Sequence, residues 1–310
     1  MQKRLAIVDY LKAFGIILVI MNHSGLFDRW NNTFFLLVID IAVPIFMMLS
    51  GYVFARRYWD STIQEMYSPH NILKSLIRYS VPMIIAVGTY VVYMLAKGNA
   101  NFPQICKKIL IGRYGQGSYY YYLMIEFLII APLMLFIIQK KKRKGFILIV
   151  TINLLFEVLW KYIHLNDSIY RILIFRYLTI ISSGMMAFFY IEHYADDSDS
   201  NADVTLKNVT LGSVCFVIGI VYKIAPKFGY EYRLFSYDPW GRTSMVSTLY
   251  IFPILYCILK RFRGIYDSRG LKTSGFIRLW TVWGGTFKDW KSLISHYVCP
   301  DDVLPYQTSF

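Results

Sequence analysis

Long apolar runs separated by short polar segments dominate the sequence. A helix needs roughly 20 apolar residues to cross a bilayer, and many of these runs approach that length. The pattern predicts membrane-spanning helices over eight stretches: residues 6–27, 33–55, 79–97, 119–138, 146–162, 172–193, 208–223 and 243–260. We therefore expect an all-α fold, a polytopic bundle of transmembrane helices.

The first apolar run carries ionisable side chains that a simple membrane anchor does not need. Asp9, Lys12 and His23 all lie within it. At about 100° per residue they fall within an arc of roughly 60°, with Lys12 and His23 about 16 Å apart along the axis. A charge in hydrocarbon costs several kcal/mol unless it faces protein or water. The stripe therefore predicts a helix face directed into the bundle; the alternative is an anchor whose charges reach the headgroups.

Composition supports the membrane assignment. The 310 residues are 56% hydrophobic and 18% aromatic, with a mean hydropathy of +0.42, which is typical of a polytopic membrane protein. The net charge of +14 does not indicate nucleic acid, because basic residues cluster beside apolar runs, as at 140–144 and 260–263. The four cysteines have no metal or redox spacing. The basic run at 140–144 predicts that this loop and the N-terminus are cytoplasmic.

The second predicted helix contains the stretch Val-Pro-Ile-Phe-Met-Met-Leu-Ser50-Gly51-Tyr52. Ser50 and Gly51 allow close helix approach, and Tyr52 suits a membrane interface. The first helix has Lys12, ten intervening residues and His23. This ordered pair of motifs resembles the acyltransferase 3 family of membrane-bound O-acyltransferases.

Three further stretches extend the resemblance in the family's order. They are Lys74 to Arg78 with Pro82, the Tyr121-Tyr122-Leu123 run, and Gly184 in the sixth predicted helix. Two positions depart from the family pattern. Lys12 stands where the family usually has Arg, and Ser75 stands at the first Arg of its basic pair, with Lys74 beside it.

The resemblance implies transfer of an acyl group, usually acetyl, from cytoplasmic acyl-CoA to a hydroxyl of a cell-surface or lipid-linked polysaccharide. The implied partners are acyl-CoA as donor substrate, the glycan or lipid-linked sugar acceptor and the lipid bilayer, with no permanently bound cofactor and no nucleic acid. The implied location is a bacterial cell membrane.

The same resemblance suggests roles for individual residues. His23 would take the proton of the acceptor hydroxyl, with Lys12 below it and Asp9 balancing the charge. The candidates for the CoA phosphates are the basic residues that flank the second and third predicted helices: Arg56, Arg57, Lys74 and Arg78. For Arg56 and Arg57 the ordinary excess of cytoplasmic positive charge is an equal explanation.

Three membrane-embedded residues complete the candidate pocket. Glu126 and Arg176 are expected either to pair across the bundle as a structural element or to line the pocket. Tyr122 could stack on a sugar, although an aromatic belt at the membrane interface is the commoner role.

The C-terminal part of the sequence differs from the rest. We expect a membrane acyltransferase-like domain over residues 1–278 and a polar tail over 279–310. In the tail, Lys288, Asp289 and Lys291 interrupt what would be the family's final apolar helix. A shortened or frameshifted gene would produce this pattern, and it predicts reduced activity.

Two other functions fit a charged stripe in a membrane bundle. A transporter or flippase for a glycan or small polar solute would line its path with such residues, and its family often shows internal repeats, which this sequence lacks. A polytopic glycan polymerase is the third candidate, although the sequence has no large outer loop.

Overall fold

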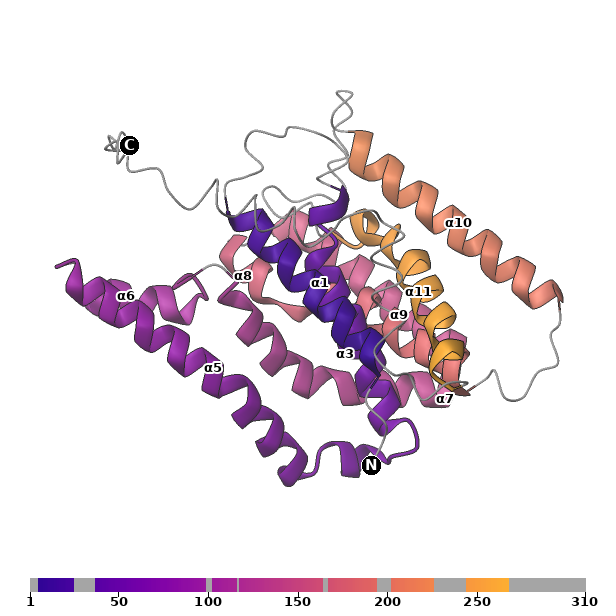
Figure 1. The fold of residues 1–310 in the computed structure, drawn as a ribbon, viewed down its shortest axis with the longest axis horizontal. Coiled ribbons are helices and arrows are strands. Elements are labelled where there is room, and N and C mark those ends of the chain that lie inside the picture. The colour runs from indigo at the N-terminus through magenta and orange to yellow at the C-terminus, as the bar shows by residue number, and fades with distance from the viewer. Residues whose placement is uncertain are drawn as a thin grey trace, which may run out of the picture. The chain divides into compact units, whose positions relative to one another are not determined.

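The computed structural model describes residues 5–24, 37–98, 102–115, 117–163, 167–193, 202–225 and 244–267. Every regular element in these ranges is helical, which confirms the all-α prediction (Figure 1). The predictions made for residues 279–310 concern a part of the chain outside the described residues. So does the predicted first turn of the second helix, at 33–36.

The helices follow the predicted runs with shifted ends. In chain order they are α1 Ala6–His23, α3 Ala42–Tyr58, α4 Ile63–Met66, α5 Pro69–Ala96, α6 Phe102–Leu110, α7 Tyr119–Ile163, α8 Asp167–Ile172, η1 Ile174–Tyr177, α9 Leu178–Phe188, η2 Phe189–His193, α10 Ala202–Ile224, η5 Val246–Thr248 and α11 Ile251–Asp267. Among the described residues, five helical segments are long and apolar enough to cross a membrane: Ala6–His23, Leu37–Tyr58, Ile63–Ala96, Tyr119–Trp160 and Ile174–Glu192. The chain is therefore a multi-pass membrane protein.

The long helix α7 consists of two helices joined at a break. Lys142 has φ 41° and ψ −112°, a conformation outside the helical region. A Cβ on Gly145 would lie 2.6 Å from the Ile137 carbonyl oxygen, so the chain folds back closely here and only glycine fits. The break lies inside the predicted loop at 139–145, between the fourth and fifth predicted spans.

Helix α5 begins at Pro69, whereas the sequence predicted a start at residue 79. Ser68 caps it by accepting from the Asn71 amide at 3.4 Å, and Pro69 occupies the first helical position. Lys74 and Arg78 therefore lie on a helix, and the prediction that placed them in a loop is wrong. The cause is the capping signal at 68–69, which the apolar pattern alone does not reveal.

The closest packing joins α3 to α9. A Cβ on Gly51 would lie 2.0 Å from the Ile181 carbonyl oxygen, and one on Gly184 would lie 1.9 Å from the Met48 carbonyl oxygen. The two glycines thus let the backbones touch, as small residues do in membrane helix pairs. A larger residue at either position would push the two helices apart.

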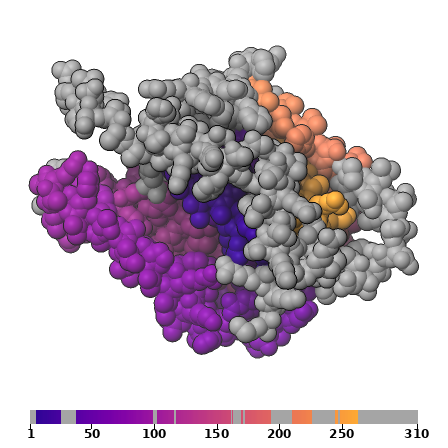
Figure 2. All heavy atoms as spheres, viewed as in Figure 1, coloured from indigo at the N-terminus to yellow at the C-terminus, as the bar shows by residue number. Residues whose placement is uncertain are grey.

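Helix α5 has a different environment, because none of its residues is buried. Apolar side chains such as Ile84, Ile85 and Val92 are each more than 60% exposed. In the space-filling view α5 shows along its length at the edge of the described helices (Figure 2). Such a surface suits lipid contact.

The chain divides into two compact units, residues 1–260 and 261–310. Of the second unit, the structure describes only residues 261–267, which end α11. The candidate site residues that the structure describes lie in the first unit.

Candidate functional site

The polar stripe of α1 lies beside the face that packs on α3. The buried face of α1 is formed by small and apolar residues: Ile7, Val8, Leu11, Gly15 and Leu18. Asp9 and Lys12 are half-buried at the flank of this face, whereas His23 is exposed at the last residue of the helix. The expectation that the stripe faces the bundle interior therefore holds only in part, because only Asp9 and Lys12 are partly enclosed.

Helices α1 and α3 run in opposite directions, so the bundle has two distinguishable ends (Figure 1). The His23 end comprises the end of α1, the start of α3 and the start of α9. The basic end comprises the end of α3 with Arg56 and Arg57 and the start of α5. From Ala42 to Tyr58, α3 rises by about 25 Å, which is the approximate separation of the two ends.

At the basic end, α3 and α5 bring several cations together. The Arg57 guanidinium donates from Nη2 to the Asn71 Oδ1 at 3.4 Å. Asn71, Lys74 and Arg78 fall within an arc of roughly 60° on α5, so the three share one face. The side chains of Arg57, Lys74 and Arg78 are exposed. The structure thus joins three of the four predicted phosphate-binding residues into one positive surface.

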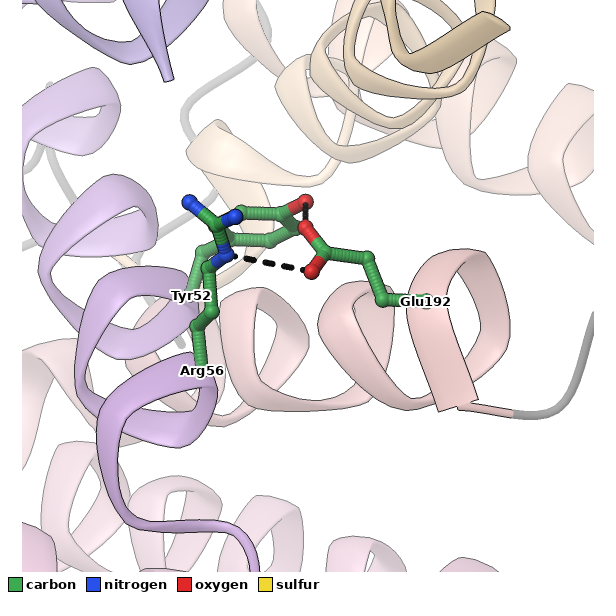
Figure 3. A network of polar contacts seen from close by, with 3 residues as sticks. All are labelled: Tyr52, Arg56 and Glu192. Carbon is green, nitrogen blue, oxygen red and sulfur yellow. Dashed lines mark hydrogen bonds and ion pairs between the residues drawn. The ribbon is translucent and has the colours of Figure 1, made fainter. Parts of the chain in front are cut away.

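Arg56 has a different environment, in a network with Glu192 and Tyr52 (Figure 3). Its Nε lies 3.1 Å from Glu192 Oε2, and both side chains are about one-fifth exposed. The Tyr52 hydroxyl donates to the other carboxylate oxygen, Oε1. One carboxylate therefore holds two side chains that stand four residues apart on α3.

The network is positioned by the π-helical segment η2. Trp59 stacks on Phe189, with ring centroids 5.3 Å apart and 25° between the planes. Tyr52 packs edge-on against Phe188 at 6.0 Å. Together with the close contact at Gly51, these rings fix the register of α3 against α9 and place Glu192 opposite Arg56. Single π turns inside helices occur often at functional sites.

Arg176 is 1% exposed in η1, near the start of α9. Its guanidinium lies 4.4 Å from the ring centroid of Tyr170 and 4.9 Å from that of Tyr177. The buried Glu157 of α7 accepts a 2.6 Å hydrogen bond from the Tyr170 hydroxyl, and its charge also acts on Arg176. A buried cation is thus compensated by a buried carboxylate through a shared tyrosine.

Glu126 and Tyr122 have local structural partners. Glu126 Oε2 accepts from the backbone amide of Ile174 at 2.6 Å and so caps the start of η1. The charge of Glu157 acts on Arg176, whereas the printed contact of Glu126 is with the backbone of η1. The Tyr122 hydroxyl donates to the carbonyl of Ile109, which ties α7 to α6.

Sequence reasoning did not single out Glu157 and Glu192, the carboxylates near Arg176 and Arg56. Glu157 carried a usable signal, since it is a carboxylate inside the predicted span 146–162. Glu192 gave no such signal, because it stands at the end of a predicted span next to a polar loop. Within the described residues, no group of three or more His, Cys, Asp or Glu side chains is arranged to hold a metal ion.

The profile of one protein family, described as an acyltransferase domain, matches residues 5–277 of the chain. The matched range contains α1 with Lys12 and His23, the α3–α9 contact and both ends of the bundle. A comparison with curated proteins finds no match, and a comparison with solved structures finds none either.

Proposed function

Because the chain belongs to the acyltransferase 3 family, we propose that it transfers an acetyl group from acetyl-CoA to a hydroxyl of a cell-surface or lipid-linked polysaccharide. The observation that carries this proposal is the placement of Lys12 and His23 on one side of α1 within the matched range. A basic surface at one end of the bundle and a histidine at the other supply the two kinds of group that the reaction needs.

In the proposed step, His23 accepts the proton of the acceptor hydroxyl. The hydroxyl oxygen attacks the thioester carbonyl carbon, the new C–O bond forms and the C–S bond breaks. The CoA thiolate leaves and is protonated from the histidinium, so protons and electrons balance. Lys12 supplies positive charge along the stripe, and Asp9 compensates it one turn away.

The donor would be bound at the basic end. Arg57, Lys74 and Arg78 offer exposed cations for the CoA phosphates, while Arg56 is held by Glu192 beside them. Since this surface and His23 are about 25 Å apart, the proposal requires the linear pantetheine arm to extend along the bundle toward His23. The adenine nucleotide then stays at the basic end.

The test is acetyl transfer by the purified chain in lipid nanodiscs. Acetyl-CoA labelled in the acetyl group is supplied with surface glycan from cells that lack the gene, and label on the glycan is measured together with released CoA thiol. Stoichiometric appearance of both supports the proposal. CoA release without labelled glycan, or neither signal from a folded chain, would refute it.

A transporter or flippase remains the alternative function, because a charged stripe also suits a substrate path. The same nanodisc assay separates the two. A flippase moves glycan between leaflets without consuming acetyl-CoA, whereas the proposed enzyme consumes one acetyl-CoA for each ester formed.

A further inference from the structure

The break in α7 carries five consecutive basic residues, 140–144, which we call the basic loop. All five side chains are exposed. The sequence has no acidic residue between Glu126 and Glu157, so α7 offers the basic loop no counter-charge of its own. The usual excess of cytoplasmic positive charge accounts for cations at such a place, but it requires no particular conformation of them.

The structure fixes the basic loop against two other elements. On one side, Gln139 donates from Nε2 to the carbonyl of Tyr58 at 3.3 Å and to that of Trp59, at the end of α3. On the other side, Arg143 donates from Nε to the Tyr190 hydroxyl of η2 at 3.0 Å. The basic loop is therefore held in place as a defined positive surface.

The cations of the basic loop differ in what they contact. The Lys142 ammonium lies 5.1 Å from the ring centroid of Phe189, and the Lys140 ammonium lies 4.4 Å from that of an aromatic ring on its own helix. Lys142 also has φ 41°, which a residue other than glycine rarely adopts unless its surroundings hold it there. Among the described residues, Lys141 and Lys144 have no contact of this kind, so their ammonium groups are available to a ligand.

Apolar side chains beside the basic loop are exposed. Ile147 and Leu148 are 60% and 50% exposed, and Leu133 is 46% exposed. They belong to the segment Tyr119–Trp160, which is long and apolar enough to cross a membrane, so these side chains suit contact with lipid. Because Ile147 follows the basic loop within one helical turn, the loop lies at the level of the lipid headgroups.

The position of the basic loop favours headgroups over the phosphates of the acyl donor. Tyr67, just before α5, donates from its hydroxyl to the carbonyl of Ile129. Ile129 precedes Lys142 by about 20 Å along α7. Lys74 and Arg78 follow Tyr67 on α5, so the basic loop lies apart from these two candidate ligands of the CoA phosphates.

We propose that the basic loop binds the headgroups of anionic phospholipids, with Lys141 and Lys144 contacting the negative charge. Clusters of about four to eight Lys or Arg residues directly beside a transmembrane helix attract anionic lipids, and each cation near the surface contributes roughly fivefold to binding. This inference does not depend on the proposed function, because it concerns neither the acyl donor nor the acceptor.

The test measures lipid binding to the full chain in nonionic detergent by native mass spectrometry. Phosphatidylglycerol and phosphatidylcholine with identical acyl chains are titrated separately, so the net charge of the headgroup is the main difference between the probes. We expect the first bound phosphatidylglycerol to bind at least tenfold more tightly than phosphatidylcholine, and this preference should narrow as the salt concentration rises.

The variants change the charge at exposed positions. Lys141→Gln combined with Lys144→Gln should weaken phosphatidylglycerol binding tenfold or more and leave phosphatidylcholine binding unchanged. Lys141→Arg combined with Lys144→Arg keeps the charge and should bind as the unaltered chain does. The matched control is Lys107→Gln combined with Lys108→Gln, which removes the same charge from exposed positions on α6 and should not weaken binding. Equal thermal unfolding midpoints in phosphatidylcholine nanodiscs verify that all variants fold.

Three outcomes overturn the proposal. The first is equal affinity of the unaltered chain for the two lipids. The second is equal weakening by the glutamine pair in the basic loop and the pair on α6, which would show diffuse attraction to the net positive charge. The third is displacement of bound phosphatidylglycerol by CoA at equal concentration, which would assign the basic loop to the phosphates of a soluble nucleotide.

Discussion

Charged side chains near the two ends of α3 differ in whether an oppositely charged side chain lies beside them. Toward the His23 end, buried charges have opposite charges beside them: Arg176 lies near Glu157, and Lys223 Nζ is 2.6 Å from Asp40 Oδ2, with both side chains at most 10% exposed. At the basic end, within the part of the chain that the structure describes, Arg56 is the cation paired with a carboxylate, whereas Arg57, Lys74 and Arg78 are exposed. One end compensates its charges internally, and the other presents positive charge to solvent or headgroups.

The contrast separates two kinds of ligand. A compensated, buried polar region in a low dielectric favours neutral polar molecules, since an added ion would lack a counter-charge. An exposed positive surface favours phosphates. Under the proposed function, the nucleotide of the donor belongs to the basic end and the acceptor to the His23 end. The following variants test this division and the packing that supports it.

The largest effect is expected at the His23 end. His23→Ala removes the proposed base, and general base catalysis is typically worth about 10²–10⁴-fold in rate. We expect a loss of at least a hundredfold in acetyl transfer, with unchanged KM for acetyl-CoA and a normal amount of protein in the membrane. Asn22→Ala, at the neighbouring exposed position of α1, should keep near-native activity. Near-native transfer by His23→Ala would remove this residue from the mechanism.

The next effect concerns the close contact between α3 and α9 at Gly51. Gly51→Ala places a Cβ 2.0 Å from the Ile181 carbonyl oxygen, so α3 and α9 must separate. Overpacking of this kind costs about 3 kcal/mol, and the thermal unfolding midpoint in nanodiscs should fall clearly. Gly88→Ala is the control, because nothing lies within 4 Å of its added Cβ. Equal midpoints for the two variants would contradict the packing described for α3 and α9.

The sequence predicts features that depend on local patterns, but not those that depend on contacts between distant segments. Gly51 and Gly184 were recognisable from their motifs, but only the folded backbone shows that they meet each other. The apolar runs predict the helices but not the ends set by capping, as at Ser68. Glu157 was visible as an intramembrane carboxylate, yet its partners Tyr170 and Met245 come from distant segments, and helical spacing carries no information about such pairs.

A moderate effect is expected on the stripe of α1. Lys12 is half-buried, one turn from Asp9. The family usually has Arg at this position, and Lys keeps its positive charge. Lys12→Arg should transfer acetyl at near-native rate, whereas Lys12→Ala should lose about tenfold, equivalent to about 1.4 kcal/mol. The assay is transfer rate at saturating acetyl-CoA. If Lys12→Ala and Lys12→Arg behave alike, the charge has no role there.

A smaller effect is expected at the basic end, and it should depend on the donor. Lys74→Ala and Arg78→Ala each remove one exposed cation, so the KM for acetyl-CoA should rise about threefold to tenfold, and less at high salt. A truncated donor without phosphates, S-acetyl-N-acetylcysteamine, should show no change of KM in either variant. Lys97→Ala, exposed at the other end of α5, is the control. Equal effects on both donors would mean that these residues do not bind phosphate.

The smallest effect distinguishes Arg56, which is paired with Glu192, from the exposed Arg57. Arg56 and Glu192 are 3.1 Å apart and each about one-fifth exposed, so solvent screens the pair and its coupling energy should be about 0.5–1 kcal/mol. A double-mutant cycle of Arg56→Gln and Glu192→Gln, read from thermal unfolding, measures this coupling. The matched cycle of Arg57→Gln and Asn71→Ala should give a coupling near zero, because that contact is exposed and 3.4 Å long. A larger coupling for Arg57 than for Arg56 would contradict the distinction between an arginine held by a carboxylate and an exposed one.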